Sequence, residues 1–287
     1  MDWKTITQID RRYLYIILFI FVSIPLLSPL NLPILVGEHA QAMYDTTETL
    51  SAGDIVVCSF DFGPATIPEN RPQAKGFLFQ ARELGLRVVA TAFWASGGPL
   101  GEDILRDVYG SDFPAIPEYG TDVVYLGYIP GNEVGMQTFG DDTWTAKGTD
   151  HYGTPMADIP LMQDTRAAED LSLWCEITSG TPGEQQVIQF VQGRHGGPAA
   201  LPLVVGSTAV SVPGMMPFYA AGQIVGILNG LSGAGEYESL LAGAYGYPTE
   251  LLAPLDAQSV AHVIVILFII AGNISYVLTR SSGGKEK

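Results

Sequence analysis

Small polar residues follow several apolar, β-rich segments of the sequence, at positions where α/β proteins commonly bind ligands. In open α/β sheets, ligands bind at the carboxyl ends of the strands, and backbone N–H groups at helix N-termini can hold an anion there. Hydroxyl residues and glycines are also ordinary caps and turns, so a purely structural role stays open. The residues of this candidate small-molecule or anion site are Asp61, Ser96, Gly97, Ser179, Thr181, Ser207 and Thr208.

Asp61, in the stretch "FDFGP", is the one residue of this set that could act as an acid or base in a hydrolase or transferase. No catalytic partner for it is evident in the sequence. The sequence also lacks a G-x-G-x-x-G turn after the first strand, a Walker A loop, a G-x-S-x-G elbow and an H-E-x-x-H helix. An enzymatic activity is therefore uncertain, and the sequence favours a protein that is not an enzyme.

A second group of candidate ligands lies in the stretch "GDDTWTAKGTDHYGT". Carboxylate oxygens are the ligands that Ca²⁺ prefers, and a histidine would suit a transition metal. The spacing is not that of an EF-hand, so a solvated acidic loop is the alternative. The four residues of this candidate metal site are Asp141, Asp142, Asp150 and His151.

The charge of the chain narrows the range of partners. Residues 36–256 contain 8 Lys and Arg against 27 Asp and Glu, a net charge of −19. A nucleic-acid partner needs a basic surface, and docking onto anionic lipid headgroups needs one as well. The composition excludes both of these, and it is compatible with a soluble exterior or with cation binding.

Alternating strand and helix patterns predict a three-layer, Rossmann-like α/β domain with a mainly parallel sheet. A short helix is expected over residues 40–50. Periodic and capping patterns predict further helices over 69–85, over 101–110 and from Thr181, which acts as a cap with Pro182 at the first helical position. Residues 130–168 are expected to be irregular, are rich in Gly, Asp and Pro, and form an insertion of about 40 residues. An irregular segment of this length is usually functional or part of an interface. The predicted strands are 54–62, 87–94, 122–129, 170–178 and 201–210.

Three glycines, Gly222, Gly226 and Gly230, recur at four-residue spacing in the stretch "AAGQIVGILNGLSGAGEYESLL". This spacing predicts a helix that starts near Pro217 and presents a glycine face. Such a face allows close packing on the domain's own sheet or on another subunit. A third membrane span and a ligand-binding loop are the alternatives.

An apolar segment lies near each end of the chain, at 13–27 and 260–278. Each is long enough to be considered as a transmembrane helix, although the first could also be a cleaved signal peptide. Lys4, Arg11 and Arg12 precede the first segment, and further basic residues follow the second. Because basic flanks favour the cytoplasmic side, both termini are expected in the cytoplasm and residues 36–256 outside it.

The two cysteines, Cys58 and Cys175, both fall within predicted strands. Cysteines of neighbouring strands lie alongside each other rather than facing, which favours buried free thiols. An extracytoplasmic compartment would also permit a disulfide.

The stretches "YGTDVVYLGYIPG", "DHYGTPMADIPLM" and "GQIVGILNGLSGAGEYESLL" resemble an uncharacterised family of prokaryotic membrane-anchored proteins. The resemblance extends from the first apolar segment to the last. It implies an anchored extracytoplasmic α/β domain and no established activity, so it supplies no catalytic residues.

Taken together, the sequence predicts a two-pass cell-membrane protein with an N-terminal anchor (1–35), an extracytoplasmic α/β domain (36–256) and a C-terminal anchor (257–287). The expected function is a structural or assembly role in a homo-oligomer or with other membrane-complex subunits, in contact with the lipid bilayer. The alternative is a small-molecule or anion-binding module, and a hydrolase or transferase is the third possibility. No cofactor is expected other than Ca²⁺ at the acidic loop.

Overall fold

The computed structural model describes residues 10–283 and divides the chain into two compact units. One unit is the α/β domain Ile34–Pro248. The other combines Met1–Pro33 with Thr249–Lys287, and its described residues form two helices.

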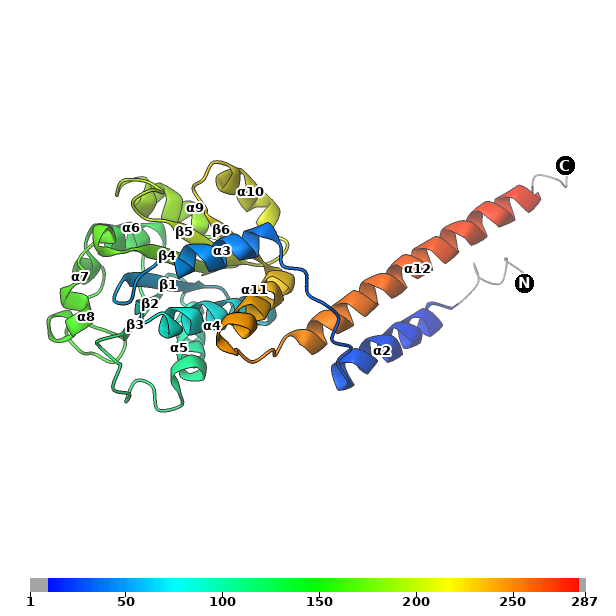
Figure 1. The fold of residues 1–287 in the computed structure, drawn as a ribbon. Coiled ribbons are helices and arrows are strands. Elements are labelled where there is room, and N and C mark those ends of the chain that lie inside the picture. Colours follow the sequence, from blue (N-terminus) through cyan, green and yellow to red (C-terminus); the bar gives the residue numbers. More distant parts are fainter. Residues whose placement is uncertain (1–9, 284–287) are drawn as a thin grey trace. The chain divides into compact units, whose positions relative to one another are not determined.

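A six-stranded, entirely parallel sheet forms the centre of the α/β domain, in the order β3-β2-β1-β4-β5-β6 (Figure 1). Strands β1 and β4 lie in the middle and are buried along their whole length, as expected for parallel strands covered on both faces. The predicted parallel α/β sheet is confirmed, with one strand more than expected. The strands are β1 (Ile55–Asp61), β2 (Arg87–Ala92), β3 (Val123–Tyr128), β4 (Leu173–Thr178), β5 (Leu203–Ser207) and β6 (Gly226–Asn229).

Helices cover both faces of the sheet and form a separate apolar core with each (Figure 1). The first face is covered by α3 (Glu38–Glu48), α4 (Ile67–Glu83), α5 (Gly97–Tyr109) and α11 (Gly230–Tyr245). The opposite face is covered by α6 (Glu133–Asp141), α8 (Pro160–Gln163), α9 (Glu184–Gln186), the π-helical turn η4 (Val187–Gln192) and α10 (Val212–Ala220). Shorter turns are η1 (Pro64–Thr66), α7 (Thr143–Ala146), η2 (Met156–Asp158) and η3 (Ala168–Asp170).

The predicted helix with a glycine face is wrong, because its residues form the end of α10, the strand β6 and the start of α11. The three glycines therefore do not share a face. Gly222 has φ +72° in the turn after α10, with no atom within 4 Å of the position where a Cβ would stand. Gly226 lies in β6, where a Cβ would be 2.4 Å from the Met43 Cα of α3. Gly226 thus allows a helix of the same domain to pack directly on the edge strand.

Two further local predictions need correction. The helix expected from Thr181 begins at Glu184 instead, because Thr181 and Pro182 belong to the loop after β4. Gly183 occupies the cap position, and its N–H donates to the Gln186 Oε1 at 3.0 Å. The insertion 130–168, expected to be irregular, contains the helices α6, α7 and α8.

Cys58 and Cys175 are free, buried thiols, as predicted. They stand opposite each other in the register of β1 and β4. Burial raises the pKa of the Cys175 thiol well above its usual value, and the neighbouring Cys58 adds to this. Both side chains therefore serve as small apolar residues of the core.

The second unit contains α2 (Arg11–Leu27) and α12 (Leu252–Gly283). Among the residues that the structure describes, one helical segment is long and apolar enough to cross a membrane: Leu252–Val277, with a mean hydropathy of 2.2. The prediction of one such helix at each end is therefore met only at the C-terminal end. Helix α2 is apolar and largely exposed, but its 17 residues span about 25 Å, less than the roughly 30 Å of a bilayer core.

Candidate ligand-binding site

The strand order places a topological switch point between β1 and β4, because the connections run in opposite directions from these two strands. Open α/β sheets of this order bind ligands in the crevice outside the carboxyl ends of the strands at that point. Asp61, predicted from the sequence as a candidate acid or base, is the last residue of β1 and lies directly at the switch point.

Asp61 is completely buried and its carboxyl is surrounded by donors from the protein itself. The N–H groups of Phe93 and Trp94 donate to Oδ1 at 2.5 and 2.9 Å, and the Ser59 hydroxyl donates to Oδ2 at 2.5 Å. These two N–H groups belong to the loop that follows β2. Asp61 therefore fixes that loop over the end of β1.

Glu176 of β4 is the partner that the sequence did not reveal. It is completely buried, and the Trp174 indole donates to its Oε2 at 2.9 Å, while Oε1 is buried without a donor. Burial raises the pKa of Glu176 well above its usual value, and the nearby Asp61 carboxylate raises it further. Burial also raises the pKa of Asp61, against the effect of its hydrogen bonds. Both carboxyl groups are therefore held toward their protonated forms, and a proton on Glu176 would supply the donor that two carboxylates lack.

Side chains close the crevice above this carboxyl pair. The Trp94 indole N–H donates to the Pro182 carbonyl at 2.8 Å and so joins the loop after β2 to the loop after β4. On the other side, a Cβ at Gly97 would stand 1.7 Å from the Phe60 carbonyl oxygen, which shows how closely α5 approaches β1. A ligand at the switch point would have to displace these contacts.

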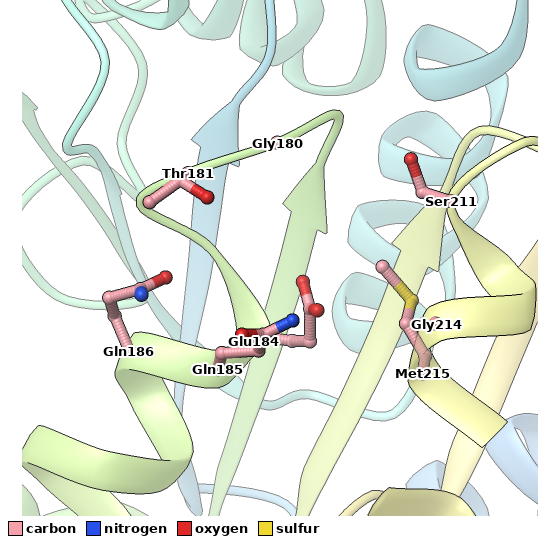
Figure 2. A pocket seen from close by; sticks show the side chains of 8 residues that line it. All are labelled: Gly180, Thr181, Glu184, Gln185, Gln186, Ser211, Gly214 and Met215. Atoms are coloured by element: carbon pink, nitrogen blue, oxygen red, sulfur yellow. The ribbon is translucent and has the colours of Figure 1, made fainter. Parts of the chain in front are cut away.

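A pocket opens one strand further along the same edge, between the ends of β4 and β5 (Figure 2). Its volume is about 140 Å³. One wall comes from the loop after β4 and the first turn of α9, and the other from α10 and the residue before it. The lining residues are Gly180, Thr181, Glu184, Gln185, Gln186, Ser211, Gly214 and Met215.

Glu184 is the buried acidic group of this pocket, with 6% of its surface exposed. Figure 2 shows its carboxyl projecting between the ends of β4 and β5, with Met215 directed toward it from α10. Burial raises the pKa of Glu184, and hydrogen bonds from its own backbone and from Gln185 oppose the rise. None of the eight lining residues is Lys, Arg or His. The pocket therefore offers carboxyl, amide and hydroxyl groups and no positive charge.

The structure brings only one residue of the predicted strand-end set, Thr181, into the wall of this pocket. Thr208 lies beside it through a 2.9 Å hydrogen bond between its hydroxyl and that of Ser211. Ser207 is buried and donates to the Thr178 carbonyl, Ser96 donates to the Phe62 carbonyl, and the Ser179 N–H donates to the Asp61 carbonyl. These three groups, like the buried Gly97, hold the loops in place.

The four predicted metal ligands each engage a different partner. Asp141 pairs with Arg194 and His195, and Asp142 caps α7. Asp150 accepts from the Tyr119 hydroxyl and from two backbone N–H groups of its own turn. His151 lies 3.5 Å from Glu102. Within residues 10–283, no group of three or more His, Cys, Asp or Glu side chains is arranged to hold a metal ion.

Two of the most informative residues, Glu176 and Glu184, were not singled out from the sequence. Glu176 is the only charged residue in the apolar segment "LSLWCEIT", and a lone charge in a strand buried on both faces needs a partner or a proton. Glu184 fits the pattern of a helix-capping residue, so only its position beside α10 distinguishes it. Comparisons of the chain with protein families, with curated proteins and with solved structures found no match.

Proposed function

We propose that the α/β domain Ile34–Pro248 is a binding module for a small polar molecule, held at a membrane by the C-terminal helix. The observation that carries the proposal is the pocket between β4 and β5, with the buried Glu184 carboxyl in its wall. Burying an acidic group without a cationic partner costs free energy in the free protein. Binding a ligand is a function that would explain why this group is present.

The size of the pocket limits the ligand. A volume of about 140 Å³ corresponds to about five water molecules at roughly 30 Å³ each, and an engineered cavity of similar volume holds one benzene molecule. A nucleotide or a dinucleotide is too large for it. The proposed ligand is therefore a small molecule, or the small end group of a longer one.

An acid–base role for Asp61 finds less support. Its oxygens already accept three hydrogen bonds from the protein, and its side chain has no exposed surface. A substrate proton must come within hydrogen-bond reach of a catalytic base. The hydrolase or transferase alternative is therefore not part of the proposal.

One support for an assembly role was the predicted glycine face. That support no longer applies, because Gly226 packs against Met43 of its own domain. An oligomeric state stays a prediction that a measurement of native mass would test.

For the membrane placement, we propose that α2 is a second, shorter span beside α12, with both termini in the cytoplasm. The Asp256 carboxylate at the start of α12 accepts hydrogen bonds from the N–H groups of Leu30, Asn31 and Leu32 at 2.7, 2.9 and 3.2 Å. These bonds join the residues after α2 to the first turn of α12, so the two helices run in opposite directions. The basic residues at both chain ends favour the same orientation.

The placement is tested with protease added to intact, right-side-out cells that carry a tag after Lys287. We expect cleavage within residues 130–168 and an intact tag, because the domain lies outside and the C-terminus inside. Loss of the tag with an intact domain would contradict the orientation.

Ligand binding is tested by identifying small molecules that co-purify with the full chain. Gly214 lines the pocket, and the position of a Cβ there has no atom within 4 Å, so Gly214→Leu should fill the pocket without disturbing its walls. Gly243 of α11 is equally open and lies outside the pocket, so Gly243→Leu is the matched control. A molecule released from the wild type and from the control, and missing from Gly214→Leu, would support the proposal. Identical extracts from all three proteins would contradict it.

A further inference from the structure

We infer that the ligand of the β4/β5 pocket carries a protonated amine, which pairs with the Glu184 carboxylate. The inference rests on the proposed function, and it names the chemical class of the ligand from the charges around the pocket.

The first argument is the missing counter-charge. None of the ion pairs within the described residues includes Glu184, whereas the basic residues named here contact other groups of the protein. Arg194 pairs with Asp141 at 2.9 Å, and Arg166 lies 3.6 Å from Asp142. Lys147 donates to the Tyr128 carbonyl at 2.8 Å. The protein therefore supplies no cation to Glu184, and a ligand can.

The second argument is the accumulation of acidic groups on one side of the sheet. Asp61 and Glu176 occupy the same face of β1 and β4, two strands that pair in register, and Glu184 follows β4 on that face. Burial and the nearby Asp61 raise the pKa of Glu176 most, and the charge of Glu184 raises it further. Three acidic side chains thus gather on this side of the sheet, and the pocket lining contains no basic residue, an arrangement that favours a cation over an anion.

The third argument separates an ammonium group from other cations. Calcium takes six to eight oxygen ligands, and Glu184 is the only carboxylate that lines the pocket. An ammonium group has three N–H donors and no acceptor. The Glu184 carboxylate and the Thr181 and Ser211 hydroxyls are acceptors of the kind it needs, and a charge-assisted hydrogen bond to the carboxylate is strong.

The test uses three two-carbon probes of almost equal size: ethanolamine, ethylene glycol and glycolate. Thermal unfolding of the full chain in detergent is measured with increasing concentrations of each. A ligand that binds only the native state raises the melting temperature. We expect a saturable rise with ethanolamine and none with ethylene glycol or glycolate.

Three variants assign that rise to the pocket. Glu184→Gln keeps the size of the side chain and removes its charge, and Gly214→Leu fills the space. Both should abolish the ethanolamine effect. Glu83→Gln, at an exposed glutamate at the end of α4, changes the net charge equally and should retain the effect.

The outcomes separate the inference from the function on which it rests. A rise with glycolate or ethylene glycol that Gly214→Leu abolishes would overturn the amine and leave the binding module standing. An ethanolamine effect that survives in Glu184→Gln would overturn the pairing with Glu184. No effect of any probe would also overturn the inference, and the co-purification experiment would then decide on the binding module by itself.

Discussion

The β1/β4 crevice and the β4/β5 pocket lie side by side at the carboxyl edge of one sheet, yet the surroundings of their acidic groups differ. In the crevice, Asp61 and Glu176 are completely buried, and protein groups occupy all of their oxygens except Glu176 Oε1. In the pocket, Glu184 lines an open volume of about 140 Å³. The strand order alone points to the crevice as the binding site.

Topology thus defines where a ligand can bind, and the side chains around that position determine whether there is room for one. Trp94 bridges to Pro182 across the end of β1, and α5 approaches Phe60 without room for a side chain at Gly97. At the neighbouring position, Gly214 lines the pocket without a side chain, and the position of a Cβ there has no atom within 4 Å. The crevice is thus a structural centre, and the pocket is the candidate site.

The largest effect should follow from Asp61→Ala in the crevice. The substitution leaves the N–H groups of Phe93 and Trp94 without their acceptor and removes the acidic neighbour of the Glu176 carboxyl. We expect the free energy of unfolding to fall by about 3–5 kcal/mol, measured by chemical denaturation. The control is Asp107→Ala, which removes a partly exposed ion pair with Arg71 and should cost about 1 kcal/mol or less. Equal losses in the two variants would mean that Asp61 has no special structural role.

The next effect concerns the proton of the carboxyl pair. A raised folded-state pKa means that native Glu176 keeps its proton while the unfolded chain loses it above the usual value of 4.5. The contribution of Glu176 to the free energy of unfolding is therefore fully present below pH 4.5 and is lost as the pH rises toward the folded-state pKa. Glu176→Gln replaces the protonated acid with an amide and lacks this dependence.

We therefore expect the stability of Glu176→Gln relative to the wild type to increase with pH above 4.5, by at most about 1.4 kcal/mol per pH unit for one proton. Denaturation curves at several pH values measure this difference. A difference that does not change with pH would show that Glu176 is ionised in the native protein.

A smaller effect is expected from Trp94→Phe, which removes the hydrogen bond that closes the crevice. The loss should be about 0.5–1.5 kcal/mol, the usual net contribution of one hydrogen bond. Amide hydrogen exchange should also become faster at residues 93 and 94, whose N–H groups Asp61 holds. Unchanged exchange at both residues would contradict the proposal that the Trp94 indole closes the crevice.

The smallest effect on stability is expected in the pocket. Gly214→Leu places a side chain in open space on α10, and leucine is favoured over glycine within a helix by roughly 1 kcal/mol or less. Thermal unfolding should therefore show a melting temperature equal to the wild type or slightly higher. A clear loss of stability would mean that the space is filled in the native protein, against the comparison drawn above.

The strands and helices could be predicted from the sequence where the local residue pattern and the packing in the folded domain favour the same structure. Buried apolar runs identified five strands, and the capping and periodic patterns identified α3, α4 and α5. Strand β6 was missed because it has four residues, begins with a glycine and lies among glycines at helical spacing. What decides its conformation is the contact of Gly226 with Met43, which is 183 positions away in the sequence.

The candidate site could be predicted only in part, because it depends on which strands are neighbours. Asp61 was identified from its place at the end of a strand. Its pairing with Glu176 requires β1 to lie beside β4, and two other strands of the sheet, β2 and β3, come between them in the sequence. Glu184 lines a pocket because α10 lies opposite the start of α9, a tertiary arrangement that no local pattern encodes.

The most direct test of the account is an experimental structure of the full chain purified from its own membranes, with no ligand added. We expect density for a small molecule between the ends of β4 and β5, in contact with Glu184, and none above the Asp61–Glu176 pair. A ligand bound at the β1/β4 crevice, with the Trp94–Pro182 bridge open and the β4/β5 pocket empty, would contradict it.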